Sequence, residues 1–127
     1  MEEILIAVVD DDASVGEAIK RLLQSHGFTV QTFNSAEQFL RNGKLNDIAC
    51  LVLDMLMPGM NGLELQQHLA LMSSQIPIVF VSGTTAAAFY ESALRAGAVA
   101  CLQKPIIDDN LLRAVRAALK RRGSSDN

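Results

Sequence analysis

The strongest constraint on the fold is an alternation of short apolar runs with longer segments of helical periodicity. Each run is four to six residues long, and between the runs apolar residues recur three and four positions apart. This alternation predicts an α/β fold with a parallel sheet buried between helices. The runs expected as strands are Ile4–Val9, Thr29–Phe33, Cys50–Leu53, Ile78–Val81 and Ala100–Gln103.

Helix ends are indicated by residues that cap or break helices. Ser14 with Glu17 has the spacing of a capping box at the start of the first helix. Ser35 with Gln38 repeats that spacing before the second helix. The expected helices are one from Ser14 to Gly27, a short one after Ser35, and three over Gly62–Met72, Thr85–Ala96 and Asp108–Arg121, with Thr84 and Thr85 as caps of the fourth.

The chain has the length of a single domain. At 127 residues it can bury roughly two thirds of the surface that its unfolded form exposes. We expect this domain to cover residues 1–122. Residues 123–127 are small and polar, which predicts a linker or tail from which an output domain would follow.

Composition argues against membranes and against direct nucleic-acid binding. No apolar run approaches the roughly 20 residues needed to cross a bilayer, and the N-terminus lacks the pattern of a secretory signal. We therefore expect a cytoplasmic location and no membrane contact. The net charge of -3 does not suit DNA binding, which depends largely on lysine and arginine.

Four of the expected strands end at polar residues that their apolar pattern does not require. Asp10 and Asp11 follow the first strand, Asp54 the third, Ser82 the fourth and Lys104 the fifth. Each alone has an ordinary structural explanation, because aspartate often begins a turn and a lone lysine is usually a solvated charge. In an open parallel sheet, however, the carboxyl ends of all strands lie at one edge, where ligands bind. Together these residues predict one site.

Three carboxylates at one site require a cation. At about 5 Å and an effective dielectric near 20, each pair would repel by roughly 3 kcal/mol. Magnesium fits, because it takes oxygen ligands and commonly uses only one or two carboxylates. With magnesium bound, Asp54 can attack phosphorus, while Lys104 neutralises phosphoryl oxygens and Ser82 donates a hydrogen bond.

Several segments together resemble the signature of response-regulator receiver domains of bacterial two-component systems. The resemblance covers about Ile4–Leu119, and Ser35–Leu40 with Met57–Met60 looks closest to FixJ-like regulators. It implies a flavodoxin-like, CheY-like α/β fold, doubly wound, with five helices and a five-stranded parallel sheet in the order 2-1-3-4-5. The segments that carry the resemblance are Val8–Asp12, Leu53–Gly62, Ser82–Gly83 and Lys104–Pro105.

The resemblance assigns a role to each residue of the site. It makes Asp11 a direct magnesium ligand, assisted by Asp10 mainly through water, and gives a further ligand position to the backbone carbonyl of Leu56. Asp12 is expected to start the first helix instead. The implied magnesium ligands are Asp10, Asp11, Asp54 and Leu56, and the residues implied in phosphoryl transfer are Asp54, Lys104 and Ser82.

The function implied is a signalling switch rather than an enzyme with a substrate of its own. Such a receiver takes a phosphoryl group from a sensor histidine kinase and assists its own phosphorylation and dephosphorylation. It signals through the face of the fourth helix, fifth strand and fifth helix, where we also expect a homodimer. DNA contact and transcription control would belong to an output domain outside this chain. The alternative is a stand-alone receiver that acts by protein–protein interaction.

Three other classes of protein fit the residues less well. A flavodoxin-type carrier needs a phosphate loop rich in glycine and hydroxyl groups, where this chain has Asp10–Asp12. A hydrolase of the aspartyl-phosphate type usually carries a second aspartate where this chain has Leu56. An interaction module with an inactive site would not need Asp54 and Lys104.

Both cysteines are expected to remain reduced. Cys50 and Cys101 would lie on strands separated by a third strand, about 9–10 Å apart, which is too far for a disulfide. Cys101 also stands where the family usually has Tyr or Phe, so we expect the loop after Ser82 to carry the signal. The resemblance also implies a cis Lys104–Pro105 step, and Gly59 and Gly62 fit a tight loop after Asp54. Because Phe89 and Tyr90 are adjacent, a helix cannot bury both fully, and we expect one of them to face solvent or a partner.

Overall fold

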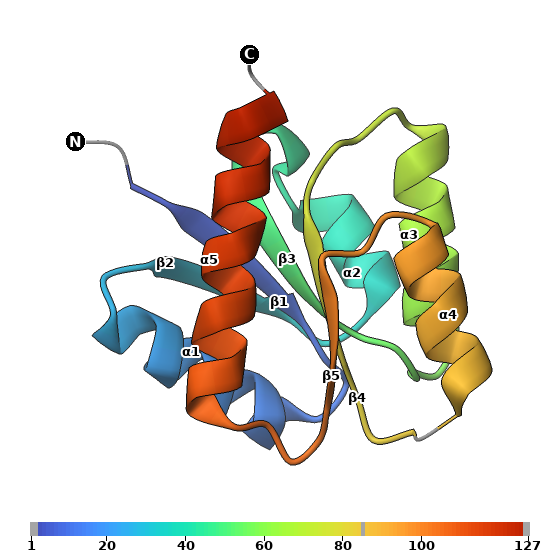
Figure 1. Cartoon of the computed structure of the whole chain (residues 1–127), viewed down its shortest axis with the longest axis horizontal. Helices are drawn as coiled ribbons and strands as arrows, with labels where there is room; N and C mark the ends of the chain where they lie inside the picture. Colours follow the sequence, from blue (N-terminus) through green and yellow to red (C-terminus); the bar gives the residue numbers. More distant parts are fainter. Residues whose placement is uncertain (1–2, 85, 126–127) are drawn as a thin grey trace.

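Five parallel strands form a single sheet in the order β2-β1-β3-β4-β5, as the sequence and its resemblance predicted (Figure 1). The computed structural model describes residues 3–84 and 86–125. Figure 1 shows the two layers of helices that enclose the sheet, with α1 and α5 on one face and α2, α3 and α4 on the other. The strands are β1 (Leu5–Val9), β2 (Thr29–Phe33), β3 (Ile48–Asp54), β4 (Ile78–Ser82) and β5 (Ala100–Gln103). The helices are α1 (Ala13–Ser25), α2 (Ala36–Asn42), α3 (Gly62–Leu71), α4 (Ala87–Arg95) and α5 (Asp108–Ser125), with a short 3-10 helix at Leu45–Asp47.

Each face of the sheet packs into its own hydrophobic core. Alternate residues of a strand point to opposite faces, so Val52 belongs to the core under α1 and α5, while Leu53 belongs to the core under α2, α3 and α4. Every residue of β3 is buried, because helices cover both of its faces. Among the described helices, none combines the length and apolar composition needed to span a bilayer.

The strand order reverses next to β1. The chain passes from β1 to its neighbour β2 on one side and then returns to β3 on the other. Ligand sites of doubly wound folds lie outside the carboxyl ends of the strands at such a point. Here these are the ends of β1 and β3, which lead directly into Asp10 and Asp54.

The capping box predicted at Ser14 is wrong by two residues, whereas the expectation that Asp12 starts the first helix is confirmed. Asp12, rather than Ser14, is the N-cap: its backbone is extended, and its Oδ1 accepts hydrogen bonds from the backbone N–H groups of Ser14 and Val15 at 2.9 and 3.4 Å. Ser14 lies inside the helix and donates its hydroxyl to the same oxygen at 2.6 Å. An ionised carboxylate suits the positive end of a helix, which explains why Asp12 takes the cap position.

The start of α2 agrees better with its predicted capping box. The Ser35 hydroxyl accepts a hydrogen bond from the Gln38 N–H at 3.0 Å. The Gln38 side chain returns a bond to the N–H of Asn34 at 2.8 Å, one residue earlier than a standard box would place it.

The ends of α4 and α5 also differ from prediction. Helix α4 begins two residues late, after Ala86, which makes no side-chain cap, and Thr84 instead accepts the Ala86 N–H at 3.1 Å. The second expected cap, Thr85, lies outside the described residues. Helix α5 continues to Ser125 instead of ending at Arg121, because one glycine costs a helix only about 1 kcal/mol. The last two residues of the expected tail are likewise outside the described part.

Candidate functional site

Three carboxylates meet at the carboxyl edge of the sheet. Asp10 and Asp11 follow β1, and Asp54 ends β3. One oxygen from each lies within 4.8 Å of the others. Asp10 and Asp54 are buried, at 2% and 3% exposure, whereas Asp11 is exposed. The sequence prediction that these side chains converge is therefore confirmed by the geometry.

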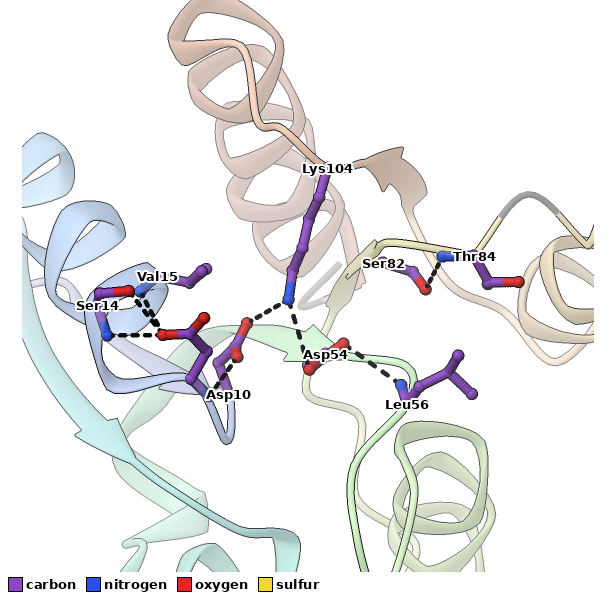
Figure 2. A network of polar contacts seen from close by, with 9 residues as sticks. Asp10, Ser14, Val15, Asp54, Leu56, Ser82, Thr84 and Lys104 are labelled. Carbon is purple, nitrogen blue, oxygen red and sulfur yellow. Dashed lines mark hydrogen bonds and ion pairs between the residues drawn. The ribbon is translucent and has the colours of Figure 1, made fainter.

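Lys104 reaches into this cluster from the end of β5 (Figure 2). Its Nζ lies 3.0 Å from Asp10 Oδ2 and 3.5 Å from Asp54 Oδ2. The ammonium therefore lies between the two buried carboxylates. The peptide bond between Lys104 and Pro105 is cis, as the family resemblance implied.

Backbone amides hold the other carboxylate oxygens. Asp10 Oδ1 accepts the N–H of Asp12 at 2.9 Å, and Asp54 Oδ1 accepts the N–H of Leu56 at 3.3 Å. Both bonds arise because each strand turns sharply just after its aspartate. They fix the orientation of the two carboxylates relative to Lys104.

The buried position changes the proton affinities of the site. Burial, and next the charge of Asp10, raise the pKa of Asp54 to about 6, although Lys104 acts in the opposite direction. Burial alone would lower the pKa of Lys104, but its contacts with Asp10 and Asp54 outweigh that effect and raise it. At neutral pH the cluster therefore holds ionised Asp54 beside a charged lysine.

The donor set suits a hard cation such as magnesium. Asp10 Oδ2 is buried and makes no hydrogen bond to any residue that the structure describes, although the Lys104 ammonium lies close to it. One lysine cannot balance three carboxylates, so negative charge remains to be offset. The oxygens of Asp10, Asp11 and Asp54, with exposed Asp11 at the open side, are ligands of the type that magnesium prefers.

Ser82 lies at the end of the strand next to Asp54. Strands β3 and β4 pair with Asp54 opposite Val81, which places Ser82 one residue further along the neighbouring strand. The side chain is fully buried, and its Oγ accepts the N–H of Thr84 at 3.1 Å (Figure 2). A hydroxyl that accepts one hydrogen bond still has its own O–H to donate.

Comparison with known proteins identifies the family. Residues 6–116 match the response regulator receiver domain. The chain belongs to the response regulator receiver family. It is 42% identical over 116 residues to the response regulator protein TodT of Pseudomonas putida, covering 91% of this chain and 51% of TodT. It is 36% identical to the transcriptional regulatory protein FixJ of Azorhizobium caulinodans, covering 94% of this chain and 57% of FixJ.

This receiver has the same fold as solved structures of response regulators. The response regulator StyR superposes with a TM-score of 0.91 at 41% identity, over 98% of this chain and 63% of that one. The receiver thus spans about half the length of the curated relatives TodT and FixJ. Their names describe response regulation and transcriptional regulation, and the match here concerns only their shared receiver portion.

Sequence reasoning missed one residue that holds this receiver's site loop. Glu37, in the first turn of α2, accepts the backbone N–H of Met60 at 3.0 Å. Met60 belongs to the loop that follows Asp54. No local pattern could reveal this contact, because the two residues are 23 positions apart.

As expected, Phe89 and Tyr90 are not both fully buried, but neither of them is fully exposed. Both rings are half-buried against the core under α2, α3 and α4. The Tyr90 hydroxyl donates to the backbone carbonyl of Thr84, in the loop after Ser82. Among the described residues of α4, the exposed large apolar side chain is that of Leu94.

Proposed function

We propose that this receiver is a phosphoryl-accepting switch in which Asp54 takes its phosphoryl group from a sensor histidine kinase in the presence of magnesium. The observation that carries the proposal is the Asp54 carboxylate, which is buried and lies beside a lysine ammonium that it shares with Asp10, at the edge where strand order reverses. Membership of the receiver family supports it.

The residues of the site divide the chemistry among them. An ionised oxygen of Asp54 attacks phosphorus, so that an Asp54–phosphorus bond forms while the phosphorus–nitrogen bond of the donor histidine breaks. The ammonium of Lys104 lies where it can offset charge on the transferred oxygens, and the Ser82 hydroxyl is available to donate to one of them. Bound magnesium would supply further positive charge to the same oxygens.

The metal site uses ligands from both strands. We assign direct contacts to Asp11, Asp54 and the backbone carbonyl of Leu56, and a contact mainly through water to Asp10. The structure supports this by bringing the three carboxylates together and by turning the chain at Leu56 back against Asp54. These groups let the receiver assist its own phosphorylation and dephosphorylation without being an enzyme that turns over a separate substrate.

Intact-mass measurement tests the acceptor residue. Wild type incubated with acetyl phosphate and magnesium should gain one phosphoryl group, and Asp54→Asn should gain none. Asp47→Asn, which removes an exposed carboxylate just before the amino end of β3, should be labelled like wild type. Equal labelling of Asp54→Asn, or no labelling of wild type, would overturn the assignment.

The output of the switch is the second part of the proposal. The FixJ match supports control of transcription by an output domain outside this chain, which would make any DNA contact. We also propose a cytoplasmic location. Exposed Leu94 supports association of two receivers through the face of α4, β5 and α5. Sedimentation of a beryllofluoride-treated sample should show dimers, and a Leu94→Ala variant should dimerise more weakly. A sample that stays monomeric would favour the alternative, a stand-alone receiver that binds a different protein.

A further inference from the structure

The loop between Asp54 and α3 carries a backbone N–H that donates to the acceptor carboxylate. We call residues 55–61 the β3–α3 loop. Its beginning is held firmly: the Met55 N–H donates to Val81 at 3.1 Å, and the Met55 carbonyl accepts the Gly62 N–H at 2.9 Å. The next residue, Leu56, donates its N–H to Asp54 itself. The position of this loop therefore affects the orientation of Asp54.

The far end of the β3–α3 loop is held by two carboxylates on consecutive amides. Glu64 Oε1 accepts the Asn61 N–H at 2.9 Å, as part of the capping box that starts α3. Glu37 Oε2 accepts the preceding N–H, that of Met60, at 3.0 Å. The first contact is local, whereas the second ties the loop to a separate helix, α2. Of these two contacts at the far end of the loop, that of Glu37 is the one that fixes it to another element.

The contact with Glu37 is close as well as polar. Gly59 has a φ of +72°, and a Cβ at that position would lie 2.8 Å from Glu37 Oε2. Glycine is therefore needed both for the backbone conformation and for the approach of the carboxylate. The hydrogen bond from Met60 lowers the pKa of Glu37, which keeps this carboxylate ionised near neutral pH.

We propose that Glu37 is a positioning residue for phosphoryl transfer to Asp54. It anchors the exposed turn at Gly59 and Met60, so that the Leu56 backbone stays in place beside Asp54. The intervening residues transmit this restraint, because Met57 is buried in the core and Pro58 has a fixed φ. The inference rests on the proposed function, since it concerns magnesium and phosphoryl binding at the same site.

Two substitutions by uncharged residues distinguish the role of the Glu37 hydrogen bond from that of its charge. Glu37→Ala removes the acceptor, whereas Glu37→Gln keeps an oxygen that can accept the Met60 N–H, and both remove the same charge. Glu91→Ala is the control, because it removes an exposed carboxylate from α4. Magnesium affinity is measured by calorimetry well below the melting temperature, where every variant is folded, and labelling by acetyl phosphate is followed in parallel.

We expect Glu37→Ala to weaken magnesium binding and slow labelling by about two- to fivefold, the effect of one exposed hydrogen bond. Glu37→Gln should recover most of the loss, and Glu91→Ala should match wild type. A Glu37→Ala protein with a lowered melting temperature but wild-type affinity and labelling rate would reduce Glu37 to a structural residue and overturn the inference. If Glu37→Ala does not fold, equal affinities of Glu37→Gln and a shortened Glu37→Asp would overturn it. Failure of the proposed function would appear differently, as absence of labelling in wild type itself.

Discussion

Asp54 is a carboxylate that the fold buries beside another carboxylate. Burial and Asp10 together raise its pKa from an ordinary value near 3.8 to about 6. As the pH rises, the Asp54 carboxyl loses its proton near pH 4 in the unfolded chain and only near pH 6 in the folded chain. Between these values the folded state binds more protons, so the free energy of unfolding falls as the pH rises. The metal-free receiver should therefore be less stable at pH 7 than the same protein with a neutral side chain in place of Asp54.

Asp54→Asn tests this directly, because it removes the charge and keeps the shape. In the presence of EDTA, we expect the variant to be more stable than wild type by roughly 1–3 kcal/mol at pH 7, with the difference shrinking towards pH 4. Urea unfolding at several pH values measures it. Asp47→Asn, at an exposed position, should show no such trend. A variant less stable than wild type at pH 7 would mean that the contact with Lys104 outweighs the cost of burial.

The two thiols provide a second test at the scale of single residues. Burial raises the pKa of Cys50 to about 12 and also raises that of Cys101, so neither is a reactive thiolate at neutral pH. Both are free in the structure, as the strand order predicted. We expect thiol counting to give two free thiols in denaturant without reductant.

Cys101→Ala should change the rate of Asp54 labelling by less than about twofold, because the Cys101 side chain forms none of the hydrogen bonds or ion pairs described at the site. Phosphorylated Cys101→Ala should also dimerise like wild type, which sedimentation can measure. A variant that accepts phosphate but no longer associates would show that the cysteine transmits the signal after all.

Site residues could be predicted from the sequence where they are polar residues that end an apolar run. Asp10, Asp54 and Lys104 are polar residues at the ends of apolar strands, and parallel topology brings such ends together. Glu37 and Tyr90 have no comparable signal, because each sits on a helix surface where polar or aromatic residues are common. Their partners are backbone groups of loops, and those positions depend on the tertiary fold.

At the scale of elements, strands were predicted more accurately than helix ends. Strands β2 and β5, at the two edges of the sheet, have the predicted limits. The fully buried β3 begins two residues before its predicted run and ends one residue after it. Two residues at the start of α1, Asp12 and Ser14, can both cap a helix, and the capping-box pattern favoured Ser14 although Asp12 is the cap. Helix α4 has no side-chain cap, so nothing in the sequence marks its first residue.

Two glycines at helix positions should respond oppositely to alanine. A Cβ on Gly62, the first residue of α3, would meet the Asp54 carbonyl and approach the Met55 Cα to 2.9 Å. A Cβ on Gly16 in α1 would meet nothing within 4 Å. Gly62→Ala should therefore destabilise the receiver by about 1–3 kcal/mol through overpacking.

Gly16→Ala should instead stabilise the receiver by roughly 0.5–1 kcal/mol, because alanine is the better helix former. Urea unfolding of both variants gives the comparison. Because Gly62 contacts the backbone of Asp54, its alanine variant should also be labelled more slowly by acetyl phosphate. Two variants of equal stability would show that the β3–α3 loop can shift without cost.

At the scale of the whole molecule, the acidic site lies at the edge of the sheet that separates the two hydrophobic cores, and its carboxylates belong to neither core. Asp10 and Asp54 lie at the carboxyl ends of β1 and β3, so repulsion between them acts on two neighbouring strands that are almost entirely buried. Lys104 offsets part of this repulsion from β5. A cation at the site should therefore stabilise the domain as a unit and not merely order a loop.

Magnesium should raise the melting temperature of the receiver in proportion to the logarithm of its concentration. Binding to the folded state alone adds about 2.7 kcal/mol when the ion is at a hundredfold excess over its dissociation constant. Asp11→Ala should reduce this response most while changing metal-free stability little, because Asp11 is the exposed carboxylate of the three. Sodium chloride at matched ionic strength controls for general screening. A melting temperature that does not respond to magnesium, or an Asp11→Ala protein that responds like wild type, would remove the ion from this site, since relief of carboxylate repulsion is the reason for expecting it there.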